Sequence, residues 1–111
     1  MFWSKRTPSA PSHTELEPAE VSARMARGEI VLVDVREPNE TAGERIPGAL
    51  LMPLSRFDPA ALPKGNVVLC CLSGKRSGMA LARCRTAGAA VTTHMRGGLM
   101  AWKAAGLPTT R

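Results

Sequence analysis

One short stretch of the chain combines a thiol, a glycine and two basic side chains: Cys71, Gly74, Lys75 and Arg76. An apolar run, 67–70, precedes the thiol, and a helical pattern follows the basic pair. In a tight turn between a strand and a helix, successive backbone amides point inward and form a cradle for an anion. Gly74 permits such a turn. These surroundings favour the thiolate, the nucleophilic form of cysteine, so the stretch predicts a reactive Cys71.

The elements that must position this loop follow an alternating pattern. Short apolar runs are predicted as strands: 30–33, 49–52, 67–70 and 91–95. Helices are predicted from Pro18 to the stop at Gly28, and then at about 54–61, 76–87 and 98–105. Strands that alternate with helices predict an α/β fold with a parallel sheet covered by helices on both faces. Ligands bind beyond the carboxyl ends of such strands, where residues 34–36, 71–77 and 96–98 are expected.

Length and composition indicate one globular domain. The chain has 111 residues, of which 44% are hydrophobic and 22% charged. Residues 1–13 are rich in Ser, Pro and Thr and are predicted to be a disordered tail, followed by a single domain over 14–111. The first residues lack the long apolar core of a signal peptide, and no apolar stretch approaches the length needed to cross a bilayer. We therefore expect no membrane partner.

The net charge and the cysteine content limit which classes of partner and which cellular compartment are expected. The net charge is +6, but the basic residues are scattered, and two Trp, two Phe and no Tyr offer little for stacking on bases. Small anions are therefore expected as partners, and nucleic acid is not. Three cysteines without a CxxC pair argue against a disulfide framework and a zinc site. Free thiols fit a reducing compartment, so we expect a cytoplasmic location.

Four motifs, in this order along residues 14–109, resemble those of the rhodanese family. Residues 71–77 resemble the active-site loop Cys-x-x-Gly-x-Arg-Ser of its small members. The other three are Leu32–Glu37, which resembles a strand ending in Asp-x-Arg-Glu, Ile46–Ala49 followed by Pro53, and Arg96–Gly98 followed by Trp102 and 105–108. The resemblance implies a three-layer fold with a mostly parallel sheet of about five strands.

The resemblance also implies a thiosulfate sulfurtransferase. Cys71 would attack the outer sulfur of thiosulfate or a similar donor, sulfite would leave, and a persulfide would remain. Cyanide or a thiol, with a protein thiol among the candidates, would then accept the sulfur, and no cofactor or metal is required. The implied substrate-binding loop comprises Leu72, Ser73, Gly74, Lys75, Arg76 and Ser77. Glu44–Arg45 and Thr41 stand where the family often has Gly-His and an aromatic residue, beside the site, which bears on substrate preference.

The adjacent thiol of Cys70 offers a second register. Counted from Cys70, the loop reads Cys-x5-Arg, the signature of cysteine phosphatases, and phosphatases and arsenate reductases of the same fold use a loop one residue longer. Gly74 stands third after Cys71, as the sulfurtransferase loop expects. If Cys70 ends the strand, the two adjacent side chains point to opposite faces. These points favour Cys71 as the nucleophile, with a Cys70 phosphatase or arsenate reductase as the alternative.

Charged residues around the loop have supporting roles in this interpretation. Asp34 ends a buried strand and is expected to hold Arg36 or the loop by charge-assisted hydrogen bonds. Arg36 and Arg96 are expected either to add positive charge at the mouth of the site or to form ordinary surface ion pairs. Lys75 is expected to steer anions. Arg76 is expected to contact substrate or to begin the helix and face solvent.

Four further residues are expected to serve packing rather than chemistry. Free cysteines are often buried, so Cys70 and Cys84 are interpreted as core residues. His94 is interpreted as a hydrogen-bonded histidine of the core or sheet edge, and Trp102 as the core anchor of the last helix.

Overall fold

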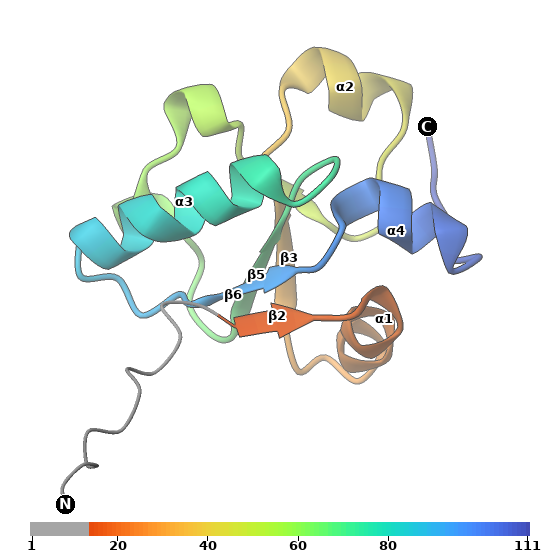
Figure 1. The fold of residues 1–111 in the computed structure, drawn as a ribbon, viewed down its shortest axis with the longest axis horizontal. Coiled ribbons are helices and arrows are strands. Elements are labelled where there is room, and N and C mark those ends of the chain that lie inside the picture. Colours follow the sequence, from red (N-terminus) through yellow and green to blue (C-terminus); the bar gives the residue numbers. More distant parts are fainter. Residues whose placement is uncertain (1–13) are drawn as a thin grey trace, which may run out of the picture.

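A sheet of five parallel strands forms the centre of the molecule (Figure 1). The computed structural model describes residues 14–111, so the predicted tail at 1–13 lies outside the described residues. The strands, in the spatial order β2-β6-β5-β3-β4, are β2 (Thr14–Leu16), β3 (Val31–Asp34), β4 (Leu50–Leu51), β5 (Val67–Cys70) and β6 (Thr93–Met95). The predicted α/β class, with its parallel sheet, is confirmed.

Helices lie on both faces of the sheet, as predicted. They are α1 (Pro18–Ala26), α2 (Pro38–Gly43), α3 (Lys75–Thr86) and α4 (Gly98–Ala104), with two 3₁₀ turns, η1 (Leu54–Arg56) and η2 (Pro59–Ala61). Figure 1 shows α3 on one side of the sheet and α1 and α4 on the other. No helix within residues 14–111 has the length and apolar character needed to cross a membrane.

Adjacent residues of the central strands feed two separate cores. Leu69 and Cys71 pack with Leu81 of α3 in one core, whereas Val68 and Cys70 pack in the other. The second core also contains Trp102 of α4, which is buried as predicted. This alternation follows from the two-residue period of a strand. It places the two neighbouring thiols on opposite faces of the sheet.

Several predicted boundaries were wrong. The predicted helix over 54–61 is two 3₁₀ turns, because Phe57 and Asp58 are extended and Pro59 disfavours a helical conformation in the residue before it. The strand predicted at 91–95 begins only at Thr93, and the one predicted at 49–52 comprises two residues. Two elements, β2 and α2, were not predicted. Strand β2 is short and, within residues 14–111, pairs only with β6, so it lacks a buried apolar pattern.

Candidate active site

The loop between β5 and α3 directs backbone amides at the sulfur of Cys71. The Cys71 Sγ accepts hydrogen bonds from the amide of Gly74 at 3.1 Å and from the amide of Ser77 at 3.3 Å. Gly74 has a φ of 103°, a conformation that a residue with a Cβ rarely adopts. Ser77 lies in the first turn of α3, whose free amides point back to the loop. The site therefore stabilises negative charge on a sulfur that is almost entirely buried.

The start of α4 holds the other side of the loop. The amide of Leu99 donates to the Cys71 carbonyl at 2.8 Å, and the amide of Met100 donates to the Leu72 carbonyl at 3.0 Å. A Cβ on Gly98 would overlap the backbone of Cys71 and Leu72. Figure 1 shows the β5–α3 loop beside the start of α4. The loop conformation thus depends on a close approach that only glycine permits at residue 98.

The two basic residues of the loop have different surroundings. Lys75 is exposed, and its expected role of steering anions stays a prediction. Arg76 neither contacts the sulfur by a hydrogen bond nor simply faces solvent, because its guanidinium donates to both Glu40 oxygens of α2, at 2.6 and 2.9 Å. These hydrogen bonds lower the pKa of Glu40 from 4.5 to about 2. The ion pair connects α2 to the first turn of α3.

Asp34, at the end of β3, and Arg36 form a buried ion pair. The Arg36 Nη2 lies 2.8 Å from an Asp34 oxygen, and the Arg36 amide donates to the other oxygen at 2.9 Å. Arg36 Nη2 also donates to the Glu44 carbonyl at 2.8 Å. The expected role of Asp34 as a holder of Arg36 agrees with this geometry. The surface ion pair that was one of the two expected roles of Arg36 was wrong, since Arg36 is 3% exposed. Its other expected role, adding positive charge at the mouth of the site, stays a prediction, and Arg36 lines a pocket beside Leu72.

Thr41 and Arg45, which stand beside the site where other residues were expected from the motifs, contact each other. Arg45 Nη1 donates to the carbonyl of Thr41 at 3.3 Å, and Thr41 is buried. Arg96 forms the surface pair that was one of its two expected roles, 3.6 Å from Glu17 with both side chains largely exposed.

The remaining thiols lie in apolar surroundings. Burial, followed by the nearby charge of Asp34, raises the pKa of Cys70 well above its ordinary value. Burial also raises the pKa of Cys84, which packs in the core on the α3 face. Both residues therefore behave as the predicted core residues. Of the two adjacent thiols, Cys71 is the one that accepts amide hydrogen bonds.

His94 links the site to the edge of the sheet. Its Nδ1 lies 2.7 Å from the Ser77 Oγ, and its Nε2 lies 3.1 Å from a Glu15 oxygen on β2. The Ser77 Oγ lies 3.6 Å from the Cys71 Sγ. His94 is thus hydrogen-bonded, as expected, but its partner Ser77 is also the residue whose amide donates to the Cys71 sulfur. Glu15 was missed, because no signal in the sequence predicted β2.

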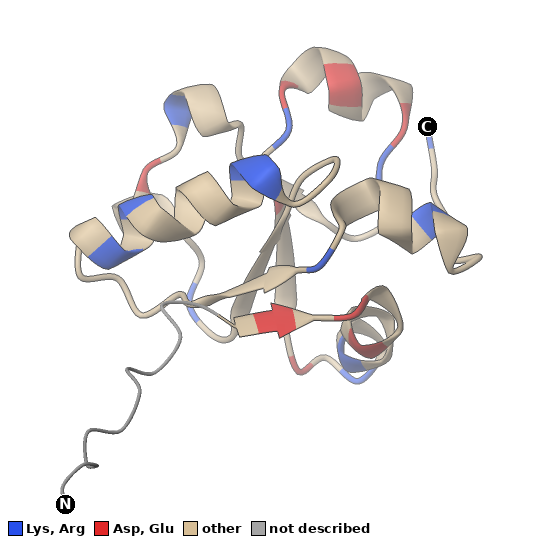
Figure 2. Cartoon of the chain, in the orientation of Figure 1, with Lys and Arg blue, Asp and Glu red and all other residues tan. Residues whose placement is uncertain are grey.

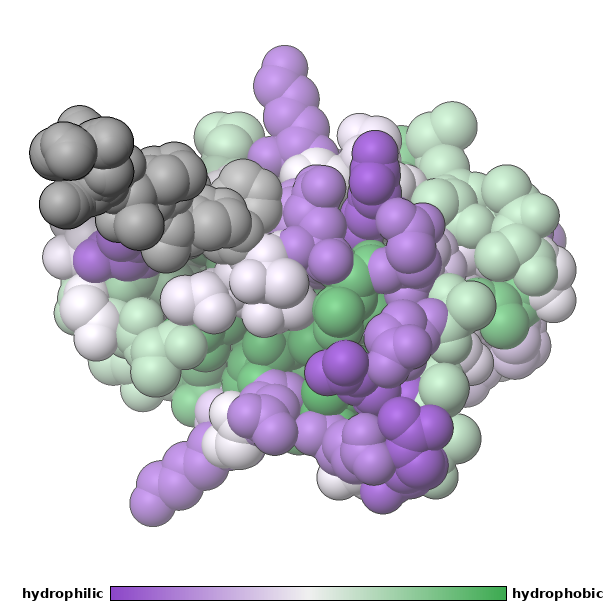
Figure 3. Space-filling model, turned by 60° about the horizontal axis from the view of Figure 1, so that its bottom comes forward, coloured by the Kyte–Doolittle hydropathy of each residue, from purple (hydrophilic) through white to green (hydrophobic). Residues whose placement is uncertain are grey.

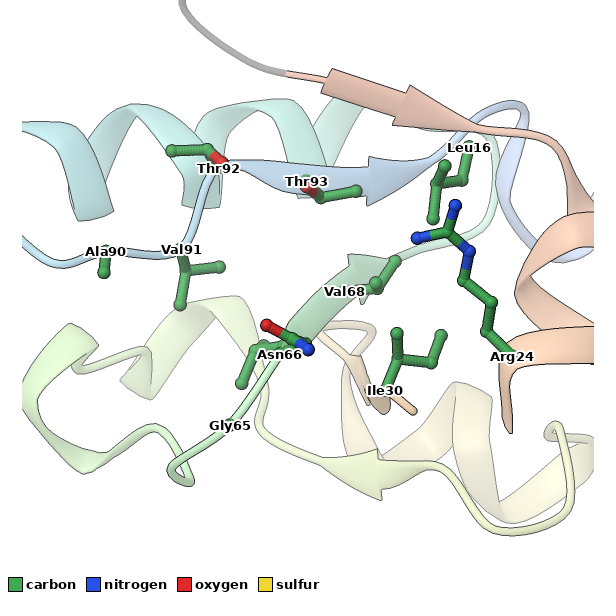
Figure 4. A pocket seen from close by; sticks show the side chains of 11 residues that line it. Leu16, Arg24, Ile30, Gly65, Asn66, Val68, Ala90, Val91, Thr92 and Thr93 are labelled. Atoms are coloured by element: carbon green, nitrogen blue, oxygen red, sulfur yellow. The ribbon is translucent and has the colours of Figure 1, made fainter. Parts of the chain in front are cut away.

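Two pockets differ in their relation to the loop. One is lined by Leu72, Met100, Lys103 and Arg111, among others, and lies beside the loop. The other contains Asn66 and Thr93, at the amino-terminal ends of β5 and β6, and therefore lies at the far end of the strands from Cys71 (Figure 4). The face seen in Figure 3 has hydrophobic surface between hydrophilic side chains. The lining of the pocket in Figure 4 therefore includes no residue of the loop between β5 and α3.

Comparisons with known proteins agree with the motifs. A family model described as a rhodanese-like domain matches residues 17–105. The uncharacterized protein slr1261 of Synechocystis is 42% identical over 106 residues, which cover 93% of this chain but only 59% of that protein. A sulfurtransferase of Allochromatium vinosum is 38% identical over 98 residues, covering 85% of this chain and 92% of that protein.

A solved structure shows the same fold. The rhodanese-related protein of Thermoplasma volcanium superposes with a TM-score of 0.78 and 23% identity, covering 88% of this chain and 98% of that one. The match to the family model confirms the resemblance noted in the four motifs. Because the family model spans residues 17–105 and two relatives match most of the chain, the protein belongs to the rhodanese-like domain family.

Proposed function

We propose that this protein is a sulfurtransferase that carries sulfane sulfur as a persulfide on Cys71. The observation that carries the proposal is the pair of amide hydrogen bonds from Gly74 and Ser77 to the Cys71 sulfur. The Allochromatium vinosum relative, which bears the name sulfurtransferase, supports the same reaction class. Backbone donors fixed around the sulfur favour a charged nucleophile and a charged leaving group at the same atom.

The proposed reaction has two displacement steps. The Cys71 thiolate attacks the outer sulfur of thiosulfate, a new S–S bond forms, and the original S–S bond breaks with its electron pair leaving on sulfite. Cyanide or a thiolate then attacks the outer sulfur of the persulfide and regenerates the Cys71 thiolate. In both steps the amides of Gly74 and Ser77 stabilise charge on the Cys71 sulfur.

The surface around the loop supports a small anionic donor. Lys75 is exposed at the loop, and the adjacent pocket is lined by three basic residues and two acidic ones: Arg36, Lys103, Arg111, Glu40 and Glu44. The Lys103 ammonium is paired with Glu44, so Lys75 and Arg111 carry the argument for an anion. Elsewhere Lys and Arg are dispersed over the molecule (Figure 2), which favours a small anion over nucleic acid as the partner. The three cysteines are free thiols, which supports a reducing compartment, and we infer a cytoplasmic location.

Intact mass spectrometry after incubation with thiosulfate tests the proposal. The wild-type protein is expected to gain the mass of one sulfur atom and to lose it on addition of cyanide. Cys71→Ser is expected to gain none, whereas Cys84→Ser, a matched change of a buried thiol, retains the gain. A gain that persists in Cys71→Ser would overturn the proposal.

The same variants test the alternative register. A phosphatase that uses Cys70 would hydrolyse an aryl phosphate in a reaction abolished by Cys70→Ser and retained in Cys71→Ser. The burial of Cys70 on the other face of the sheet, and its raised pKa, argue against this outcome. Turnover of that kind, without sulfur uptake, would replace the sulfurtransferase proposal.

A further inference from the structure

We propose that Ser77, His94 and Glu15 form a proton relay that takes the thiol proton from Cys71. This inference rests on the proposed function in one respect, that Cys71 is the nucleophile. Ser77 contacts the reacting sulfur, whereas His94 and Glu15 act through Ser77 and are positioning residues. The relay runs from the loop, through β6, to the edge strand β2.

The contacts form an unbroken chain. The Cys71 Sγ lies 3.6 Å from the Ser77 Oγ, which lies 2.7 Å from the His94 Nδ1. The His94 Nε2 lies 3.1 Å from Glu15 Oε2. Cys71, Ser77 and His94 are buried, but the Glu15 side chain is 42% exposed. This series of hydrogen bonds therefore joins a buried thiol to a carboxylate in contact with solvent.

The contacts of Ser77, His94 and Glu15 support the following state before proton transfer. An ionised Glu15 accepts only, so the Nε2 of His94 carries a hydrogen and donates to it. In a neutral ring Nδ1 is then an acceptor, and it takes the hydrogen bond of the Ser77 hydroxyl. The Ser77 Oγ in turn accepts from the Cys71 thiol. Each donor in this chain thus has an acceptor.

A shift of two protons converts this state into the reactive one. The hydroxyl proton of Ser77 moves to Nδ1 of His94, and the thiol proton of Cys71 moves to the Ser77 Oγ. The products are a thiolate and an imidazolium, and no electrons are transferred between groups. The Ser77 hydroxyl can then donate to the thiolate, beside the amides of Gly74 and Ser77. The carboxylate of Glu15 stabilises the imidazolium.

The Glu15 carboxylate, 3.1 Å from the His94 Nε2, supplies a counter-charge to the imidazolium. In the register of the sheet, His94 stands opposite Glu15 on β2 and opposite Leu69 on β5, which is apolar. On α3, Arg76 interacts electrostatically with Cys71, but its charge is paired with Glu40 of α2. The carbonyl of Gly74 also accepts from Ser77 Oγ, at 3.2 Å, and competes with Nδ1 for that hydroxyl proton.

The pH dependence of Cys71 alkylation tests the relay. Rates of modification by iodoacetamide are measured from pH 5 to pH 10, with peptide mapping of Cys71. His94→Asn keeps a hydrogen-bonding side chain but cannot take up a proton. We expect the alkylation rate of this variant at pH 7 to fall about tenfold. This fall corresponds to a rise of about one unit in the pH at which the alkylation rate is half its maximum, the midpoint of the profile. At high pH, where the thiolate forms without the relay, its rate should reach the wild-type value.

The charge of Glu15 has its own test. Glu15→Gln keeps an acceptor for the His94 Nε2 but removes the charge. The pH midpoint of Cys71 alkylation should therefore rise, as in His94→Asn, but by a smaller amount. Glu17→Gln, which removes an exposed carboxylate near the same strand, is the control and should leave the midpoint unchanged. Glu15 is exposed at the sheet edge, so this variant carries the test if His94→Asn does not fold.

Two results would overturn the relay: a wild-type pH profile in both variants, or a rate lowered by the same factor at every pH. The second result would indicate a purely structural role. Alkylation requires no sulfur donor, so the two proposals fail separately. A protein that shows His94-dependent alkylation but takes no sulfur from thiosulfate would refute sulfur transfer and retain the relay.

Discussion

At the scale of single residues, Cys70 and Cys71 show how one peptide unit changes the chemistry of a thiol. Cys70 ends β5 and packs among apolar side chains, and burial raises its pKa. Cys71 has left the strand, and its sulfur accepts two amide hydrogen bonds. In the proposed function, the point at which the chain leaves the sheet therefore selects Cys71 rather than Cys70 as the nucleophile.

Asp34 and Arg36 provide a prediction at this scale. Asp34→Asn leaves the buried Arg36 guanidinium without a charged partner, and breaking a buried pair typically costs about 3–5 kcal/mol. We expect a loss of this size in the free energy of unfolding, measured by urea denaturation. Glu20→Gln, which breaks the exposed pair with Arg24, should change it by about 0.5 kcal/mol or less. Equal losses in the two variants would contradict the prediction.

At the scale of elements, the start of α4 holds the loop between β5 and α3, and Gly98 permits the close contact between them. A Cβ at this residue would lie 2.6 Å from the Leu72 carbonyl oxygen, and its φ of 61° is itself unfavourable for other residues. We expect Gly98→Ala to lower the free energy of unfolding by about 1–3 kcal/mol. It should also reduce persulfide formation on Cys71, because the Leu99 and Met100 amides can no longer reach the loop carbonyls.

A matched glycine provides the control. Gly43 ends α2 without a positive φ, and a Cβ there would meet no atom within 4 Å. Gly43→Ala should leave both stability and sulfur uptake close to wild type. Persulfide formation at the wild-type level in a folded Gly98→Ala protein would contradict the role assigned to α4.

The ion pair between α2 and α3 predicts a pH dependence of stability. Folding lowers the pKa of Glu40 from 4.5 to about 2, chiefly through Arg76, so the pair stabilises the protein above about pH 4.5. That contribution is lost as the pH falls toward 2. At pH 7, Glu40→Gln should be less stable by about 1 kcal/mol, because the pair is partly exposed.

Urea denaturation of the wild type and Glu40→Gln at several pH values measures this difference. It should shrink between pH 4.5 and pH 2. Arg76→Gln removes the other partner and should show the same trend. A difference that stays constant over this range would show that the pair contributes nothing that depends on ionisation.

At the scale of the whole molecule, the two cores share their strands. Val33 and Leu69 contribute to one core, and Leu32 and Val68 to the other. If the helices on one side separated from the sheet, the apolar face of the strands on that side would be exposed to water. The same strands also form the core on the other side, so loss of one core would weaken the other. We therefore expect a single cooperative unfolding transition.

Two probes on opposite faces test this expectation. Trp102 reports on one core by fluorescence, in a Trp3→Phe background, and labelling of Cys84 reports on the other. The urea midpoints of the two signals should coincide. Separate midpoints would show that the two layers unfold independently.

The sequence by itself determined the parts that depend on neighbours along the chain. Short β-branched runs and helical spacing located β3, β5 and α3, because burial imposes the period of each element. The thiol, Gly74 and Ser77 lie within seven residues, so the amide cradle is a local structure that the loop pattern could indicate. The family motifs likewise follow from the order of residues alone.

Only the tertiary structure decided which distant side chains meet. Arg76 pairs with Glu40, 36 residues away, and His94 bonds Glu15, 79 residues away. Neither contact leaves a periodic signal, because each is set by which strands are adjacent in the sheet and which helix ends face each other. The amides around the Cys71 thiol therefore come from residues nearby in the sequence, whereas the charged groups around it come from distant ones.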